Sequence, residues 1–388
     1  MPKPALIEGY AVPDVSNSAA RLKVGPVLLA DGVRRFNFWT YMYAAFICIG
    51  MLAGMNFLQS YVLTEHLHIP ANQQGEVTGN LAFWTEIVAI ILIVPFGILS
   101  DRIGRRPVMV SGILFLALGY ALFPLATSII ELTLYRIVYA VGAAALSALI
   151  AIVGNDYTEE ASRGRLFGFT GLMNGLGVIF MSVVIAAIPA ALTSRGVEPV
   201  AAGIAMFLTA AALCVMAAVI FSCGLKGGVP VTNTSPPPIR ALLTSGLRAA
   251  TNPRIALSYG AAFAGRSDTA VKGLFVSLWV LQVAPLAAKN LPLFVLLAVG
   301  QGSAIIASVT LVGQEAPAKE RGTIVATSGL FGAIGILGAA VIGGRLFDSV
   351  GPSAPFVMLG LLQLVLCVAA VLVRVLSPGA SRAQIHAA

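Results

Sequence analysis

Long apolar runs separated by short polar segments fill the chain up to residue 222. Each run is close to the roughly 20 residues that an α-helix needs to cross a bilayer. The runs are Asn37–Leu63, Leu81–Leu99, Val108–Ala126, Leu132–Val153, a glycine-containing run around Gly168–Gly177, and Ala201–Phe221. This pattern predicts six membrane-spanning helices in succession.

The second half of the chain repeats the first at a fixed offset. Three short motifs of the first half recur 158 positions later, and the longest begins at Gly171 and again at Gly329. Internal repeats of this kind are common in transporter folds. The runs that this offset pairs with the fourth, fifth and sixth helices are Leu291–Leu311, Thr323–Ile342 and Phe356–Val373.

Upstream of these runs the offset fails, because the second half is too short. In the first half, Leu132 lies 95 residues after Asn37. In the second half, the corresponding interval from Ile255 to Phe294 is 39 residues. The difference, about 56 residues, corresponds to two spanning helices of ~20 residues each and a loop. We therefore predict six helices followed by four, without equivalents of helices 8 and 9. The alternative is a further turn of the chain hidden within residues 267–288.

Composition makes this an all-α polytopic membrane protein. The sequence is 58% hydrophobic and only 10% charged, whereas a soluble domain carries about 25% charged residues. The net charge of +8 belongs to membrane-flanking loops, so we expect no nucleic acid as a partner. The four cysteines lack metal-ligand spacing, and no metal site or cofactor is expected.

The chain divides into two predicted helical bundles with polar segments around them. The segment between the bundles contains three consecutive prolines and four basic residues but no acid, which is typical of a loose connector. The predicted parts are a cytoplasmic leader (1–35), an N-terminal six-helix bundle (36–222), a cytoplasmic linker (223–254), a C-terminal four-helix bundle (255–375) and a cytoplasmic tail (376–388).

The turn after the second apolar run carries the most specific motif of the chain. It reads G-x-L-S-D-R-x-G-R-R-P from Gly97 to Pro107. It resembles the loop signature of the major facilitator superfamily, which joins transmembrane helices 2 and 3. The resemblance implies a two-bundle transporter fold, but it specifies no substrate. The residues of the implied gating loop are Gly97, Asp101, Arg102, Gly104, Arg105 and Arg106.

The same resemblance implies that Asp101 faces the start of the helix near Thr323 when the cytoplasmic side is closed. The three arginines of the loop also indicate its side of the membrane, because cytoplasmic loops are rich in Lys and Arg. The next loop toward the N-terminus holds Glu65, His66, His68 and Glu76 with no Lys or Arg, as an external loop should. We expect both termini to be cytoplasmic, in a bacterial inner membrane with lipid around the helices.

Three charged residues fall inside the predicted seventh helix: Arg266, Asp268 and Lys272. Ionisable groups at membrane depth are costly, so function is the first hypothesis for them. Asp268 and Lys272 are four residues apart and share a face, with the acid toward the N-terminus. They form either a substrate or proton site in the central cavity, or a neutral pair that holds the helix in register.

Glu86 and Arg136 form a second candidate pair, since both lie at similar depth in helices that run the same way. Residues 136–142 resemble a helix-4 motif of the superfamily, R-x-x-x-G-x-G, although an alanine replaces one of its glycines. In relatives that arginine is associated with proton coupling. Asn56 and Gln59 are further polar candidates in the first helix.

Taken together, these features predict a carrier that moves a small solute by alternating access. Its transport is either secondary active, as a symporter or an antiporter, or facilitative. Three embedded cations against two embedded anions favour an anionic or zwitterionic solute. The competing hypothesis is a non-transporting scaffold or receptor, with a partner chain covering the shortened half. No nucleophile, base and orienting group occur together at membrane depth, so we do not expect an enzyme.

Overall fold

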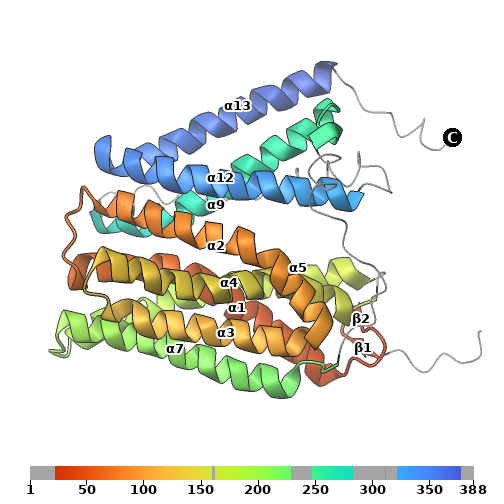
Figure 1. The fold of residues 1–388 in the computed structure, drawn as a ribbon, viewed down its shortest axis with the longest axis horizontal. Helices are drawn as coiled ribbons and strands as arrows, with labels where there is room; N and C mark the ends of the chain where they lie inside the picture. The colour runs from red at the N-terminus through yellow and green to blue at the C-terminus, as the bar shows by residue number, and fades with distance from the viewer. Residues whose placement is uncertain (1–21, 160–161, 229–246, 283–310, 312–320, 377–388) are drawn as a thin grey trace, which may run out of the picture.

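The computed structural model describes residues 22–159, 162–228, 247–282, 311 and 321–376. Most of these residues lie in long helices that run side by side (Figure 1). The long helices are α1 (Arg35–Tyr61), α2 (Gln74–Ile103), α3 (Arg105–Leu122), α4 (Ile129–Tyr157), α5 (Arg163–Ile179), α7 (Pro199–Gly224), α9 (Pro253–Gln282), α12 (Arg321–Ser349) and α13 (Ala354–Leu376). The short elements are β1 (Lys23–Val24), β2 (Val27–Leu28), α6 (Ile188–Thr193), π-helical turns at Val62–His66 and Phe180–Ile185, and a 3-10 turn at Phe123–Leu125.

The predicted helical membrane protein is confirmed. Eight of the described helices are long and apolar enough to span a bilayer. Their ends extend past the predicted runs: α2 begins at Gln74 rather than Leu81, and α4 continues to Tyr157. A 30-residue helix such as α2 is about 45 Å long. It therefore exceeds the ~30 Å hydrocarbon core, and its polar ends escape a search for apolar runs.

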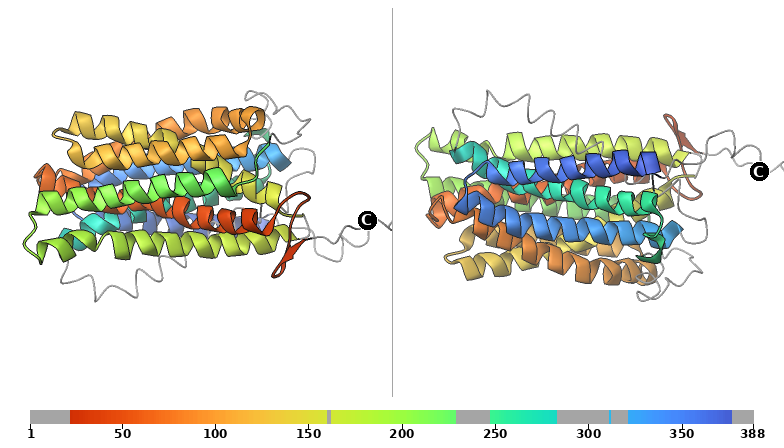
Figure 2. Two further views of the ribbon diagram at one scale, coloured as in Figure 1. Left: turned by 90° about the horizontal axis from the view of Figure 1, so that it is seen from below. Right: turned by 90° about the horizontal axis from the view of Figure 1, so that it is seen from above.

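The second half contributes α9, α12 and α13 to the described structure. These helices lie over one face of the first-half bundle (Figure 2). α9 coincides with the predicted seventh helix, and α12 and α13 contain the predicted runs that begin at Thr323 and Phe356. The run Leu291–Leu311 lies outside the described residues except for its last position, so the tenth helix stays a prediction.

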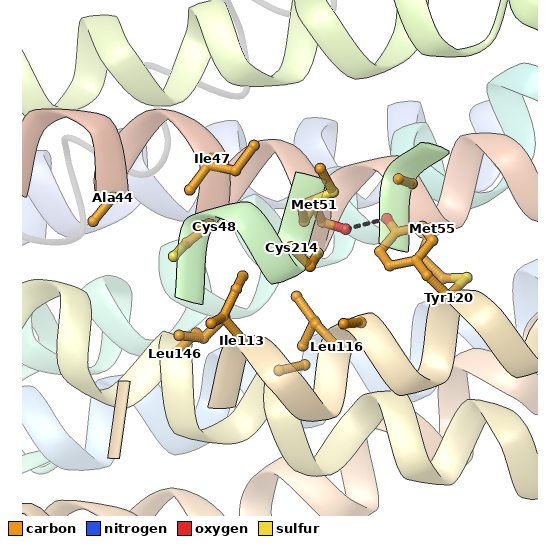
Figure 3. Packing of buried hydrophobic residues seen from close by; sticks show 14 of the residues in the cluster. Ala44, Ile47, Cys48, Met51, Met55, Ile113, Leu116, Tyr120, Leu146 and Cys214 are labelled. Carbon is orange, nitrogen blue, oxygen red and sulfur yellow. Dashed lines mark hydrogen bonds between the residues drawn. The ribbon is translucent and has the colours of Figure 1, made fainter. Parts of the chain in front are cut away.

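A continuous apolar core joins the helices of the first half. α1 packs against α5 and α7, while α3 packs against α4 and α7. Met51 of α1, Ile113 and Leu116 of α3, and Cys214 of α7 meet near the centre of this core (Figure 3). The Tyr120 hydroxyl donates to the Met51 carbonyl at 2.6 Å. Cys214 is buried in this core with a free thiol.

The internal repeat is visible in the packing. In the first half, Gly177 of α5 lies against the carbonyl of Phe46 in α1; in the second, Gly335 of α12 lies against the carbonyl of Phe263 in α9. Both glycines are required, because a Cβ would overlap those carbonyls. The phenylalanine and the glycine of this contact are 131 residues apart in the first half and 72 residues apart in the second. The second half thus has 59 fewer residues between these two equivalent contacts.

The two halves meet where α12 and α9 pack against α2 and α1. At the Gln74 end of α2, Gly79 lies against the carbonyl of Ala340, and Gly344 lies against the carbonyl of Gly75. Small residues spaced by four let the two helix backbones approach closely. Toward Ile103 the helices diverge (Figure 1). The halves are thus closely packed at one end of the interface.

An acidic side chain completes this closely packed end. The Asp348 carboxylate, near the end of α12, accepts hydrogen bonds from the backbone N–H groups of Gly75 at 2.9 Å and Glu76 at 2.6 Å. These N–H groups belong to the first turn of α2 and have no partner within their own helix. Asp348 thus caps a helix of the other half.

Candidate functional site

Arg136 is the most completely enclosed charge in the first half, with 2% of its surface exposed. From α4, its Nε donates to Thr85 Oγ1 of α2 at 2.9 Å, and its Nη2 donates to Asn56 Oδ1 of α1. The guanidinium also lies 4.9 Å from the ring centre of Tyr139. Its Nη1 is buried without a hydrogen-bond partner among the described residues. Neutral groups of three helices therefore hold this charge.

Arg136 does not form the predicted ion pair with Glu86. No nitrogen of Arg136 lies within 4 Å of a Glu86 oxygen, and the described ion pairs all belong to Arg105. The prediction assumed that equal depth was enough. Consecutive helical residues point about 100° apart, and it is Thr85, one position earlier, that faces α4. A threonine in an apolar run carries little signal, so the sequence reasoning missed it.

Glu86 faces the second half instead. Ala82, one turn earlier on the same side of α2, packs in a cluster with Val271 and Ala340 of α9 and α12. Arg266 belongs to α9 of the opposite half, and its side chain lies beside Gly332 of α12. The acid and the base thus belong to helices of opposite halves that pack against each other.

Polar residues of α1 form the remaining wall of this interface. Ser60 and Ser277 of α9 share a hydrogen bond of 2.8 Å. Asn56 Nδ2 would lie 3.6 Å from a Cβ placed on Gly273 of α9. Gln59 is fully buried, and both its amide atoms lack partners among the described residues. The sequence reasoning found Asn56 and Gln59 but missed the serines, which are common in apolar helices.

Asp268 occupies a different side of α9. It is fully buried, and its Oδ2 accepts from Gln363 Nε2 of α13 at 2.9 Å. Ser277, nine residues later and therefore about half a turn around the helix, faces α1. Lys272 lies one turn later on α9, but no ion pair within 4 Å joins these two described side chains. Asp268 thus lies between α9 and α13, away from the α1 interface.

The loop signature forms a compact ionic cluster at the diverging end of α2. Arg105 donates to Asp101 Oδ1, to Ser100 Oγ at 2.6 Å and to Asp156 Oδ2 at 3.0 Å. Gly104, which links α2 to α3, has φ +98°, a conformation that favours glycine. The expected contact between Asp101 and the start of α12 involves side chains that are not described, and it stays a prediction.

Histidine and cysteine do not form a metal site in the described part of the chain. No group of three or more His, Cys, Asp or Glu side chains occurs there. His66 Nδ1 contacts the carbonyl of Pro124 at 3.1 Å, which accounts for one of the two external-loop histidines by ordinary packing.

This arrangement, two packed helical halves with charged groups between them, is typical of a helical membrane transporter. The sequence matches the Major Facilitator Superfamily over residues 41–289. The chain belongs to that superfamily. The loop signature had predicted this membership, which is thereby confirmed.

Individual relatives are more distant. The magnetosome protein MamH of Paramagnetospirillum magneticum is 26% identical, with 84% of this chain and 89% of that protein matched. The magnetosome protein MamZ of the same species is 27% identical over 64% of this chain and 39% of its own length. The inner membrane transport protein YajR of Escherichia coli is 36% identical over 83 residues, 21% of this chain and 18% of that protein.

Solved structures support the fold alone. The nucleoside transporter NupG matches with a TM-score of 0.59 at 12% identity, over 86% of this chain and 99% of that chain. A bacterial homolog of the human lysosomal transporter Spinster matches with a TM-score of 0.53 at 15% identity, over 88% of this chain and 92% of its own. At such identities the likeness concerns architecture and not substrate.

Proposed function

We propose that the chain is a secondary carrier that moves a small charged solute across the membrane by alternating access. The observation that carries the proposal is the polar interface between α1, α2 and α9, where buried and charged groups of both halves meet at membrane depth. Carriers bind their solutes at such a midplane junction. Relatives include proteins named for inner membrane transport and tetracycline resistance, which supports a non-enzymatic transporter.

We propose that the Gln74 end of α2 faces outside and the arginine-rich loop faces the cytoplasm. The positive-inside rule supports this orientation, because Arg102, Arg105 and Arg106 cluster at one end. The termini would then be cytoplasmic and the membrane the bacterial inner membrane. In that orientation the described conformation is closed outside, where Asp348 and the small residues of α12 meet α2.

We also propose that the second half lacks the equivalents of helices 8 and 9. The interval between repeated contacts, 72 residues against 131, supports this. So does the match to MamH, which runs over 399 aligned positions, more than the 388 residues of this chain. The matched 84% of this chain is about 326 residues, so about 73 of the 399 aligned positions of MamH have no counterpart in this chain. That number is large enough for two spans of ~20 residues and their loops.

The roles of the deeper charges are a further part of the proposal. Arg136 would bind solute or couple transport through its Nη1, while Thr85 and Asn56 fix its position. Asp268 has one buried oxygen, Oδ1, without a described partner. A carboxyl in that position is a candidate for reversible protonation, and Lys272 would balance its charge.

The test is uptake into proteoliposomes made with the purified full chain. We expect uptake of at least one small charged solute above that of empty liposomes, and its loss in Arg136→Gln. A folded protein that takes up no member of a panel of anions, cations and zwitterions would favour the alternative, a scaffold or receptor completed by a partner chain. Copurification of a second protein from the native membrane would support that alternative.

A further inference from the structure

We infer that the groove between α9 and α13 binds one anionic phospholipid, with an acyl chain in the groove and the phosphate beside the arginines at its open end. The groove is lined by apolar residues of both helices and has a volume of about 410 Å³. α13 forms the outer edge of the second half, and α9 packs against it (Figure 1). The inference goes beyond the proposed transport function and does not depend on the solute.

The groove is about as long as one leaflet of a bilayer is thick. Its lining runs from Pro253 to Ala264 on α9 and from Leu362 to Val373 on α13. Each interval is 11 residues, or about 17 Å of helix. Half of the ~30 Å hydrocarbon core is about 15 Å. An acyl chain of one leaflet therefore matches this groove, whereas a membrane-spanning helix would need a groove about twice as long.

A polar contact closes the inner end of the groove. Asp268 lies one turn beyond Ala264 on α9, and its Oδ2 accepts a hydrogen bond from Gln363 Nε2 of α13 at 2.9 Å. Gln363 directly follows Leu362, the groove residue of α13 nearest this end. Asp268 is also at the middle of α9 along its length. The groove is thus confined to one half of the membrane.

Small residues make the α9 wall of the groove hollow. Ala256, Gly260 and Ala264 are spaced by four residues, so they lie one above the other on one side of the helix. A Cβ added at Gly260 would meet one described atom within 4 Å, Leu366 Cδ1 at 3.6 Å, which is an ordinary contact distance. The wall is therefore not closely packed against α13 at this level.

Arginines gather at the open end of the groove. Arg254 is in the first turn of α9, Arg374 is in the last turn of α13, and Arg248 lies in the short turn before α9. Residues 247–264 and 362–376 contain no Asp or Glu. Basic residues between transmembrane helices bind anionic lipid headgroups. A zwitterionic headgroup would add a positive group among these arginines, so the charge favours an anionic lipid.

The open end lies at the arginine-rich end of the molecule. Ile255, near the start of α9, packs in one cluster with Ile324, near the start of α12, so these helices start at the same end. The other end of α12 carries Asp348, which caps the start of α2. The open end of the groove is therefore level with the end of α2 and the loop signature. In the proposed orientation this is the cytoplasmic leaflet, whose surface potential is negative.

The internal repeat indicates why a lipid, and not a helix of this chain, covers the groove. In the first half, α3 covers the junction of α1 and α7, where its Ile113 and Leu116 meet Met51 and Cys214 (Figure 3). The counterparts of α1 and α7 are α9 and α13. Within the described residues, α13 packs mainly against α9 and α12. The proposed shortening removes the counterpart of α3, which leaves this face to lipid.

The first experiment measures lipid binding to the purified full chain by native mass spectrometry in detergent. The probes are phosphatidylglycerol, which is anionic, and phosphatidylcholine, which is zwitterionic, with identical acyl chains. We expect one phosphatidylglycerol per chain to bind at least about fivefold more tightly than phosphatidylcholine, which is the contribution of one arginine near an anionic lipid surface.

Substitutions that fill the groove test its location. Ala256→Phe on α9 and Ala369→Phe on α13 each place a ring in the groove. Each should weaken phosphatidylglycerol binding about tenfold or more, the effect of displacing about two methylene groups of the acyl chain. Ala212→Phe, at an exposed alanine of α7, is the matched control and should bind normally. Unfolding temperatures verify that each variant is folded.

Removing a charge tests the headgroup. Arg374→Gln should weaken phosphatidylglycerol binding about fivefold and leave phosphatidylcholine binding unchanged, because only the anionic headgroup loses a partner. Lys23→Gln is the matched control, since it removes an exposed basic residue from the β1–β2 hairpin at the same end of the molecule (Figure 1). Its binding of both lipids should equal that of the unsubstituted chain.

Three results would overturn the inference: equal binding of the two lipids by the unsubstituted chain, phosphatidylglycerol binding that survives both groove-filling substitutions, or a folded protein that retains neither lipid. A second protein or a second copy of the chain that dissociates in Ala256→Phe but not in Ala212→Phe would also overturn it, because a helix would then occupy the groove. No solute enters these measurements, so their outcome is separate from the test of transport.

Discussion

Replacing Asp348 with asparagine should weaken the closed end of the interface between the halves. Both oxygens of this carboxylate accept hydrogen bonds from the first turn of α2, at 2.9 and 2.6 Å. The negative charge also lies at the positive end of that helix. An asparagine side chain has one neutral acceptor oxygen. Asp348→Asn therefore removes one hydrogen bond to α2, makes the other a bond to a neutral acceptor, and removes the attraction between the carboxylate and the positive end of α2.

The expected magnitude follows from these losses. A hydrogen bond to a charged group contributes about 1.5–3 kcal/mol, and a carboxylate at an exposed helix N-terminus about 0.3–1 kcal/mol. Asp348 is only partly buried, so solvent screens it and the low end of these ranges applies. We expect Asp348→Asn to destabilise the closed end by about 1.5 kcal/mol, or about tenfold in the ratio of closed to open molecules.

Distances between spin labels at Gln73 and Val350 would measure this ratio, since these exposed positions flank the outer ends of α2 and α12. The four native cysteines would first be replaced. We expect Asp348→Asn to increase the population with the longer distance. The matched control is Arg345→Gln, which removes a charge one turn earlier on α12. Equal effects of the two substitutions, or an unchanged distance distribution in Asp348→Asn, would refute the reasoning.

Three further outcomes are expected. Gly79→Leu should open the same end more strongly than Asp348→Asn, because its side chain would overlap the backbone of α12. Gly168→Leu in α5, where an added Cβ would meet no described atom within 4 Å, should not change the spin-label distance. Arg136→Lys should lower initial uptake about tenfold, since an ammonium cannot reproduce the geometry of the guanidinium fork. Asp268→Asn should abolish gradient-driven uptake and reduce expression, while adding Lys272→Gln should recover expression only, because it restores the balance of embedded charge. Uptake in the double variant would make the two charges structural.

The fold could be predicted because hydropathy and one motif determine most of it. Spans of about 20 apolar residues have few folded solutions in lipid. The signature around Asp101 then identified the superfamily. The ends of the helices could not be predicted, since α2 starts seven residues before its apolar run, in a polar segment that includes Gly75 and Gly79. These glycines contact α12, and nothing near them in sequence indicates that partner.

The sequence indicates which individual residues are candidates for the site, but it does not indicate which of them contact one another. The cost of charge in lipid drew attention to Glu86, Arg136 and Arg266. Their partners depend on the rotation of each helix about its axis, which the sequence does not specify in a nearly uniform apolar run. A rotation of one residue exchanges Glu86 for Thr85 as the neighbour of Arg136. The hydrogen bond between Ser60 and Ser277, which joins the two halves, could not be predicted for the same reason.

The proposed shortening is compatible with alternating access, because the described contacts between the halves use helices that remain. α9 and α12 provide them, through Ser277 and the small residues near Ala340. Rocking about this interface does not require helices 8 and 9. On α5, a Cβ added to Gly171 or Gly175 would meet no atom of the described residues within 4 Å. A carrier built this way would keep its hinge and its charged site, and would depend on lipid or another chain to seal one wall.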